Sequence, residues 1–124
     1  MARTAADRVA NGQAPVNNAY KETGGLRWGE TLYRGMNASW PFAKLHASRD
    51  QIRIEVSLFW VWRRTFKFSR ADIRALRRTS GTMSVGLRVE HERFDYPPFI
   101  VFWTFQYPTL KARLGELGYE VLDR

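Results

Sequence analysis

The stretch QIRIEVSLFWVWRRTFKFS, residues 51–69, decides the fold class of this chain. Its first part places an aliphatic residue at every second position from Ile52 to Leu58, with polar residues between them. Its last part repeats the alternation with Phe66 and Phe68. A period of two is typical of a β-strand with one face on a core and the other in water. We therefore predict two strands, QIRIEVSL and RTFKFS, paired as a hairpin.

The middle of this stretch, FWVWRR, contains no Gly, Pro, Asn or Asp to form a tight turn. The connection is therefore expected to be a wider loop or a bulge, which places Trp60 and Trp62 at the hairpin end beside Arg63 and Arg64. Such a tip could contact a membrane, a nucleic acid or a protein partner. Alternatively, the tryptophans fold back over an open end of the core and leave the arginines exposed.

The flanking sequence predicts more strands of the same kind. We expect strands over residues 42–47 and 83–92, with an extended piece around 31–34 before Trp40-Pro41. Residues 72–78 are predicted as a strand, with a short helix begun by a Ser69–Asp72 capping box as the alternative. FIVFWTF, residues 99–105, is apolar on both faces, so we expect the last helix or a second subunit to cover its outer face.

The C-terminal part predicts one amphipathic helix. Leu110, Leu114 and Leu117 follow the spacing of one helical face, Pro108 suits the first turn, and Gly118 is placed as a C-terminal cap. The fold class is therefore mainly β with one C-terminal α-helix, as a sandwich or open barrel of six to seven antiparallel strands capped by the helix. Residues 1–25 are expected to be a flexible leader ending at Gly24-Gly25, and residues 26–124 a single domain.

Composition limits the function classes. The 124 residues contain no cysteine, which excludes disulfides, thiolate catalysis and cysteine-ligated metals. No apolar run approaches the roughly 20 residues of a membrane-spanning helix, and the N-terminus lacks the apolar core of a signal peptide. We therefore expect a cytoplasmic protein, with peripheral attachment to a membrane as an option.

The net charge of +8 is concentrated in one part of the chain. Residues 49–78 carry nine Lys and Arg against three Asp and Glu, a net charge of +6. Such a concentration either focuses a field on phosphates or merely solvates outer strand faces. The candidate binding patch combines these cations with the hairpin aromatics: Trp60, Trp62, Arg63, Arg64, Lys67, Arg70, Arg74, Arg77 and Arg78.

Enzymatic chemistry finds little support in the sequence. No serine stands in a nucleophile-elbow context, and no glycine-rich phosphate loop is present. His46 is expected to face outward, whereas His91 shares the parity of the inner face and is flanked by Glu90 and Glu92. A lone histidine between glutamates is more often a satisfied strand-end residue than a metal ligand. We expect no enzyme, no cofactor and no metal.

The order of elements resembles the pleckstrin-homology-like superfold, including GRAM-type and small bacterial PH-like domains. The resemblance rests on NASWPFAKL (37–45), IRIEV (52–56), RTFKFSRADI, GLRVEH (86–91), FIVFWTF and LKARLGELGYEV. It implies a binding module that docks on anionic lipids, peptides or proteins. Lipid-binding members typically place Lys and Arg in the loop between their first two strands. The loop expected there, residues 47–50, has one Arg beside an Asp and does not match.

The sequence therefore predicts a non-enzymatic binding module that docks weakly, through residues 59–68, on an anionic membrane surface or a protein partner. Two alternatives remain. One is a structural homo-oligomer subunit with FIVFWTF or the tryptophan hairpin at its interface. The other is a basic nucleic-acid-binding protein, where bases stack on aromatics and arginines follow phosphates.

Overall fold

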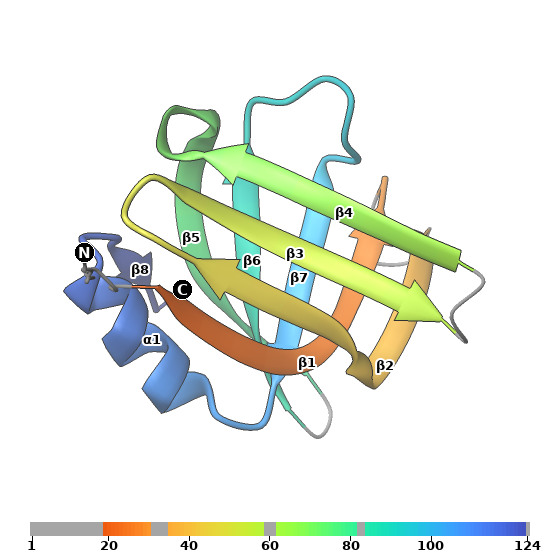
Figure 1. Cartoon of the computed structure of the whole chain (residues 1–124), viewed down its shortest axis with the longest axis horizontal. Coiled ribbons are helices and arrows are strands. Elements are labelled where there is room, and N and C mark those ends of the chain that lie inside the picture. The colour runs from red at the N-terminus through yellow and green to blue at the C-terminus, as the bar shows by residue number, and fades with distance from the viewer. Residues whose placement is uncertain (1–18, 31–34, 59–61, 82–83, 124) are drawn as a thin grey trace, which may run out of the picture.

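One curled β-sheet and one helix make up the fold (Figure 1). The computed structural model describes residues 19–30, 35–58, 62–81 and 84–123. Within them lie eight strands, one α-helix and a short 3₁₀ turn. In chain order these are β1 (Tyr20–Gly29), β2 (Gly35–Ala47), β3 (Gln51–Leu58), β4 (Trp62–Ser69), η2 (Arg70–Asp72), β5 (Ile73–Ser80), β6 (Val85–His91), β7 (Phe99–Thr104), α1 (Tyr107–Glu116) and β8 (Val121–Leu122).

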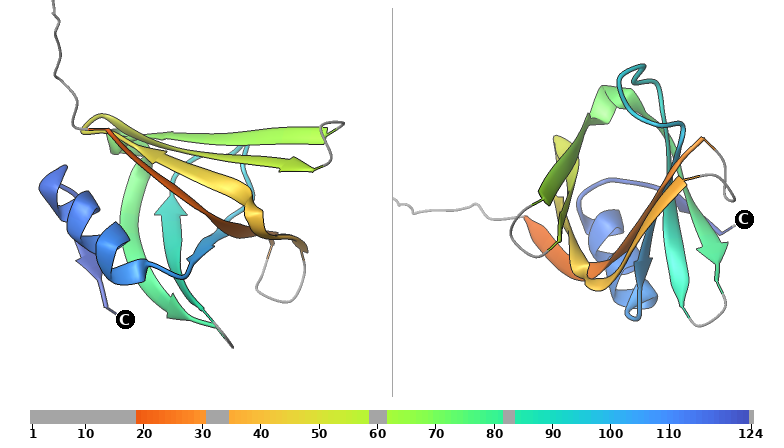
Figure 2. Two further views of the ribbon diagram at one scale, coloured as in Figure 1. Left: turned by 60° about the horizontal axis from the view of Figure 1, so that its bottom comes forward. Right: turned by 90° about the vertical axis from the view of Figure 1, so that its right-hand side faces the viewer.

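The strand order in the sheet is β4-β3-β2-β1-β7-β6-β5-β8. All neighbouring strands are antiparallel except β5 and β8, which are parallel. The sheet curls until β3 and β4 lie in front of β5, β6 and β7, and α1 covers one end (Figures 1 and 2). The mainly β fold with one C-terminal helix is confirmed. The sheet does not close into a barrel, because it ends at β4 and β8 without pairing them.

The free edge of β4 is bridged to the other half of the sheet by the loop after β6. The hydroxyl of Tyr96 accepts a hydrogen bond from the main-chain N–H of Lys67 at 3.0 Å, and Arg93 donates to the Lys67 carbonyl oxygen at 3.1 Å. The Tyr96 ring also packs edge-on against Phe66 and Phe68. The connection between β6 and β7 therefore fills the gap that a closed barrel would fill with paired strands.

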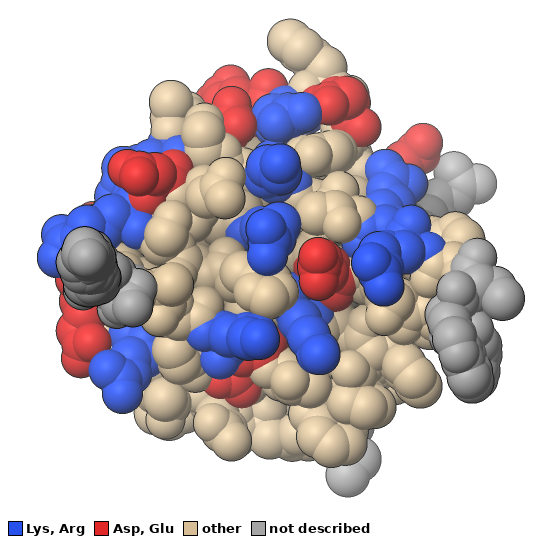
Figure 3. Space-filling model, in the orientation of Figure 1, with Lys and Arg blue, Asp and Glu red and all other residues tan. Residues whose placement is uncertain are grey.

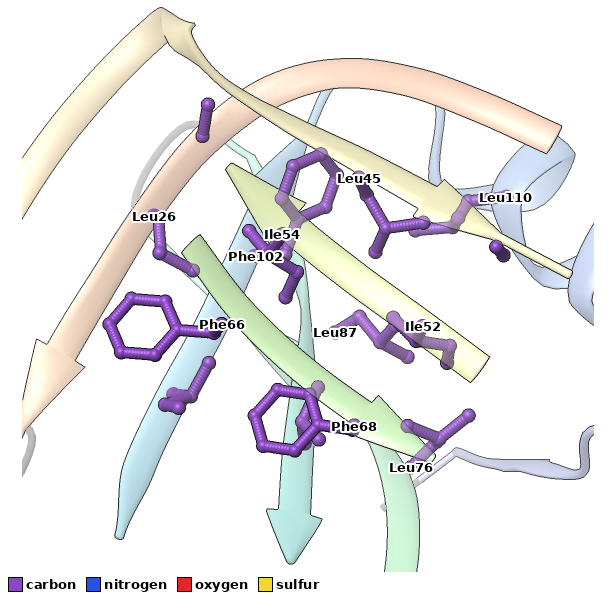
Figure 4. Close-up of a cluster of buried hydrophobic side chains, with 14 of the residues drawn as sticks. Leu26, Leu45, Ile52, Ile54, Phe66, Phe68, Leu76, Leu87, Phe102 and Leu110 are labelled. Atoms are coloured by element: carbon purple, nitrogen blue, oxygen red, sulfur yellow. The ribbon is translucent and has the colours of Figure 1, made fainter. Parts of the chain in front are cut away.

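The core lies between the two halves of the sheet (Figure 4). The alternation predicted for residues 51–58 and 64–69 is confirmed, since Ile52, Ile54, Val56, Phe66 and Phe68 are buried and the residues between them within each strand are not. The opposite half contributes the inward side chains of β6 and β7, including Leu87 and Phe102. Burying a Leu, Ile or Phe side chain stabilises a fold by about 1.5–3 kcal/mol relative to exposure, so these residues are the main source of stability.

The predicted leader is wrong for residues 20–25, because β1 begins at Tyr20. Gly24 and Gly25 do not mark a boundary. They lie inside β1, next to the position where its pairing with β2 shifts register. A Cβ atom on Gly24 would lie 2.1 Å from the Trp103 carbonyl oxygen, so glycine permits a close approach of two strands there. Residues 1–18 lie outside the described residues.

A bulge interrupts β2. Ala43 pairs with Gly24 and Ala38 pairs with Leu26, so residues 39–42 of β2 stand against Gly25 alone. Proline is tolerated at position 41 because this part of β2 needs no ladder hydrogen bond, and the Trp40–Pro41 peptide bond is cis. β2 starts at Gly35, whereas the sequence predicted a strand that starts at residue 42. The extended piece predicted around 31–34 lies outside the described residues.

The segment after β4 contains both structures that the sequence left open. A single 3₁₀ turn, η2, begins after Ser69, whose main-chain N–H donates to the Asp72 carboxylate at 3.0 Å. β5 then follows from Ile73, which confirms the predicted strand. Asp72, which suggested the start of a helix, therefore stabilises a single turn. The predicted strand follows directly after this turn.

The outer face of β7 is covered by its own sheet. Gly86 on the neighbouring strand has no side chain, and a Cβ atom there would lie 2.6 Å from Val101 and 2.8 Å from Trp103. Both side chains therefore extend over β6, and the Arg88 guanidinium lies 5.1 Å from the centre of the Phe99 ring. The expectation that the helix covers this face is wrong, because the buried leucines of α1 join the inner core.

The helix itself agrees with the sequence. Leu110, Leu114 and Leu117 are all buried in the core cluster. Gly118 ends α1 with a φ of 93°, a left-handed conformation that glycine adopts without strain. The leucine stripe closes one end of the space between the two halves of the sheet.

Candidate functional site

The predicted patch is not one surface, and its hairpin part lies at one end of the core. Trp62 stacks on Trp28 of β1, with ring centroids 5.9 Å apart and 12° between the planes. Arg64 shares its strand face, and its guanidinium lies 4.7 Å from the centre of the Phe66 ring. Arg63 points to the other face, opposite Ser57. Trp62 therefore helps to close the core, and Trp60 lies outside the described residues.

The four later arginines of the patch are distributed over the turn and β5, where most have intramolecular partners. Arg70 donates to the main-chain oxygens of Arg49, Leu117 and Gly118, at 2.7–3.1 Å. Arg74 pairs with Glu92 at 3.3 Å, and Arg77 with Glu90 at 2.8 Å.

Arg78 donates to Ser80 at 3.2 Å and lies 5.9 Å from the Tyr107 ring. Arg70 is therefore held by three main-chain acceptors, whereas Arg74 and Arg78 donate to the exposed side chains of Glu92 and Ser80.

Lys67 is the member of the predicted patch that belongs to a continuous basic surface. It lies directly opposite Arg53, which lies opposite His46, which lies opposite Lys21. These four residues form a row, here called the basic row, that crosses β4, β3, β2 and β1 on the outer face. Figure 3 shows Lys and Arg side chains across the centre of this face. Directly opposite neighbours have Cβ atoms about 4.5–5.5 Å apart.

Few negative charges lie close enough to neutralise the positive charges of the basic row. The nearest acid is Glu55, whose carboxylate lies 3.6 Å from His46 Nε2. Burial, followed by the charge of Arg53, lowers the pKa of His46 below its usual value of 6.5. Among the described residues, the buried Nε of Arg53 has no hydrogen-bond partner. Like charges directly opposite each other destabilise a sheet, so this arrangement favours an anionic counterpart from outside.

A second feature is an apolar pocket at the β2 bulge, here called the bulge pocket. Its volume is about 320 Å³. The rings of Trp40, Trp103 and Phe105 line it, together with Gly25 and Gly81. The Trp40 and Phe105 rings meet edge to face at 6.3 Å and remain 54% and 68% exposed.

A third feature is a hollow of about 480 Å³ that lies next to the bulge pocket and shares Trp40 and Phe105 with it. We call it the helix-side hollow, because Arg113 of α1 lines it together with Lys21 and Glu22 of β1. The buried Glu22 carboxylate accepts hydrogen bonds from the Tyr20 hydroxyl and, at 2.6 Å, from Thr104 Oγ1. Burial, followed by the bond to Glu22, raises the pKa of Tyr20.

The histidines do not form a metal site. His91 is buried, and Nε2 lies 2.8 Å from the Pro97 carbonyl oxygen while Nδ1 accepts from the main-chain N–H of Arg93 at 3.0 Å. Both ring nitrogens therefore have partners, as the inner-face parity of His91 suggested. In the described parts of the chain, no group of three or more His, Asp and Glu is arranged to hold a metal ion.

In comparisons with known proteins, no family model matches the chain, and no curated protein matches it. Within the described ranges, no helix is both long enough and apolar enough to span a bilayer.

The structure adds residues that the sequence did not assign to the candidate patch. Lys21, His46 and Arg53 complete the basic row, and Trp40 and Phe105 line both hollows. Arg53 could have been found from the sequence, because it alternates with Ile52 and Ile54 and therefore faces outward on a predicted strand. No signal was available for Lys21, because its strand was assigned to the leader.

Proposed function

We propose that this chain is a non-enzymatic interaction module that docks on anionic membrane surfaces through the basic row. The observation that carries the proposal is the unbroken order Lys21, His46, Arg53, Lys67 across four strands of one sheet face. In this role the chain is a cytoplasmic protein that attaches to the membrane surface without crossing it.

The charges support weak, reversible attachment. A Lys or Arg side chain near an anionic leaflet contributes about 1 kcal/mol, so the three permanent cations of the row contribute about 3 kcal/mol together. Exposed aromatics add to this, because the Trp40 ring is suited to the boundary between headgroups and acyl chains. Attachment of this strength depends on salt, since ions screen exposed charges over about 10 Å at 0.1 M.

The pleckstrin-homology-like resemblance is part of the proposal. Support comes from the run of antiparallel strands followed by a helix that closes one end of the core. With β1 included, however, residues 30–34 separate the first two strands in sequence, whereas residues 48–50 join β2 to β3. The loop with one Arg beside an Asp therefore connects the second and third strands, and the basic row lies on the sheet face.

The test is co-sedimentation with vesicles of phosphatidylcholine alone and with added phosphatidylserine, at low and physiological salt. An Arg53→Gln, Lys67→Gln double variant removes two charges of the row from exposed or half-buried outer positions. An Arg74→Gln, Arg77→Gln variant is the matched control, because it removes the same charge from β5. We expect the first variant to lose most binding to phosphatidylserine vesicles and the control to keep it.

Thermal unfolding of each variant separates loss of binding from loss of fold. Equal binding by the wild type to both kinds of vesicle would contradict an anionic target. Loss of binding only in a Trp62→Ser, Arg63→Gln, Arg64→Gln variant would assign docking to the hairpin end. Binding to single-stranded DNA with no binding to vesicles would favour the nucleic-acid alternative over the membrane.

A further inference from the structure

We infer that the bulge pocket and the helix-side hollow together bind one single-chain amphipathic carboxylic acid. Its hydrocarbon chain occupies the bulge pocket, and its carboxylate lies in the helix-side hollow near Lys21 and Arg113. This inference goes beyond membrane docking and rests on different residues, apart from Lys21 and Trp40.

The bulge pocket has the chemistry of an apolar ligand site. Ligand sites in proteins begin at about 300 Å³ and are lined mainly by apolar and aromatic side chains with a few polar groups. The bulge pocket has about this volume and three aromatic walls, and the polar side chains among its described lining residues are uncharged, namely Asn37, Ser39, Ser84 and Thr104. A hydrocarbon chain fits these walls because they offer no charged group to hold a polar molecule.

The pocket lies where the pairing of β2 with β1 is irregular. Residues 39–42 stand against Gly25 alone, and a Cβ atom on Gly25 would lie 2.7 Å from the Ala38 carbonyl oxygen, so glycine permits the close approach of β2 to β1 beside the pocket. The exposed rings of Trp40 and Phe105 lose contact with water when apolar atoms lie against them. Each Å² of apolar surface removed from water contributes about 25 cal/mol, so occupation of the pocket is favourable.

The helix-side hollow favours a negatively charged end on the ligand. Trp40 and Phe105 line both hollows, so a chain lying across their edge has one end in each. The helix-side hollow offers Lys21 and Arg113, and Arg113 is also 3.1 Å from Glu116. Glu22 lines it too, but its two oxygens already accept from Tyr20 and Thr104. With Glu22 counted, the charged residues of the lining carry a formal net charge of +1, which favours an anionic head group.

The test uses the fluorescent fatty acid cis-parinaric acid, with decanoate as a competitor below its micelle concentration and decanol as its uncharged match. Ser39→Phe places a ring in the bulge pocket from an exposed position, and Ser57→Phe makes the same change elsewhere on the sheet. We expect Ser39→Phe to weaken decanoate binding at least about tenfold and Ser57→Phe to leave it unchanged.

A Lys21→Gln, Arg113→Gln variant tests the head group. Two exposed charge contacts correspond to about a fivefold loss of decanoate affinity, with decanol affinity unchanged. The inference is overturned if the wild type does not bind the probe, if Ser39→Phe binds it as tightly as the wild type, or if decanoate and decanol lose affinity equally in the charge variant.

The Arg53→Gln, Lys67→Gln variant distinguishes this inference from membrane docking. It should lose vesicle binding and keep decanoate binding, since neither residue lines the two hollows. Either proposal can therefore fail while the other stands.

Discussion

The guanidinium of Arg70 donates a hydrogen bond to the main-chain oxygen of Leu117 at 2.7 Å, although the two residues are 47 positions apart. The same side chain donates to the oxygens of Gly118 and Arg49 and lies 4.1 Å from the centre of the Tyr119 ring. It thereby joins the turn after β4 to the end of α1, where helix carbonyls have no partner within the helix. Arg70 is thus an integral part of the fold.

We predict that Arg70→Ala destabilises the protein by about 1–3 kcal/mol, because hydrogen bonds from a charged donor to helix-end carbonyls are lost. Arg70→Lys should recover little, since one ammonium group cannot reproduce the planar fork of a guanidinium. Urea denaturation measures both variants. Arg74→Ala is the control, because its exposed ion pair with Glu92 contributes about 0–1 kcal/mol. Equal losses for Arg70→Ala and Arg74→Ala would contradict the structural role of Arg70.

Two glycine-to-alanine substitutions should have opposite effects on stability. Gly86→Ala places a Cβ atom within 2.6 Å of Val101 and 2.8 Å of Trp103, and overpacking of this kind costs about 1–3 kcal/mol. Gly115→Ala meets nothing within 4 Å on the exposed side of α1, and alanine in a helix gains about 0.5–1 kcal/mol over glycine. Thermal unfolding of the pair is the measurement, and a stable Gly86→Ala would show that β7 does not pack over β6 as described.

Vesicle docking should strengthen as the pH falls through the range of His46. The pKa of His46 is lowered, so the imidazole is neutral near pH 7 and gains its proton only below 6.5. Lys21, Arg53 and Glu55 face it from the neighbouring strands, and protonation adds one more cation to the basic row. One charge near an anionic leaflet is worth about 1 kcal/mol, or about fivefold in affinity.

Co-sedimentation with phosphatidylserine vesicles at about pH 7.5 and about pH 5.5 measures this effect. His46→Gln should bind like the wild type at the higher pH and lack the increase at the lower one. An unchanged increase in His46→Gln would assign the pH dependence to another group.

Acid should remove a stabilising contact at the turn after β4. The hydrogen bonds from Ser69 lower the pKa of Asp72 below its ordinary value of 3.8. The folded state therefore holds the carboxylate form more tightly than the unfolded chain does. The resulting stability is present above pH 3.8 and is lost as the pH falls through the lower, folded-state pKa.

Thermal midpoints of the wild type and Asp72→Asn, measured from neutral to strongly acidic pH, check the sign of this effect. The wild type should be more stable at neutral pH, and the difference should shrink as Asp72 becomes protonated. A difference that stays constant over the whole range would mean that the charge of Asp72 does not contribute.

The sequence predicted the elements whose pattern is local. Alternation over residues 51–58 and the leucine stripe from Leu110 to Leu117 are both set by which side chains face the core, and both were correct. β1 was missed because its sequence, YKETGGLRWG, mixes polar residues with two glycines. Its strand conformation depends on pairing with β2 on one side and β7 on the other, and single-sequence patterns do not report such pairing.

The candidate site was predictable only in part, for the same reason. The basic segment was visible as charge, and Lys67 belongs to the surface that now carries the proposal. The row itself requires the register of four strands, and Arg70 and Arg77 lie near Lys67 in sequence but serve other contacts. The bulge pocket depends on unequal numbers of residues in the paired strands β1 and β2, and no residue type in the sequence predicts such an inequality.

The position of β1 between β2 and β7 has a consequence for how the chain folds. During synthesis β1 can pair with β2 soon after both emerge, but its other edge waits for β7, which is made near the end. Closing so long a loop carries a larger entropy cost than forming the hairpins on either side of it. We expect two antiparallel meanders to form early and their joining along β1 to be the slow, late step, with α1 and β8 completing the fold afterwards.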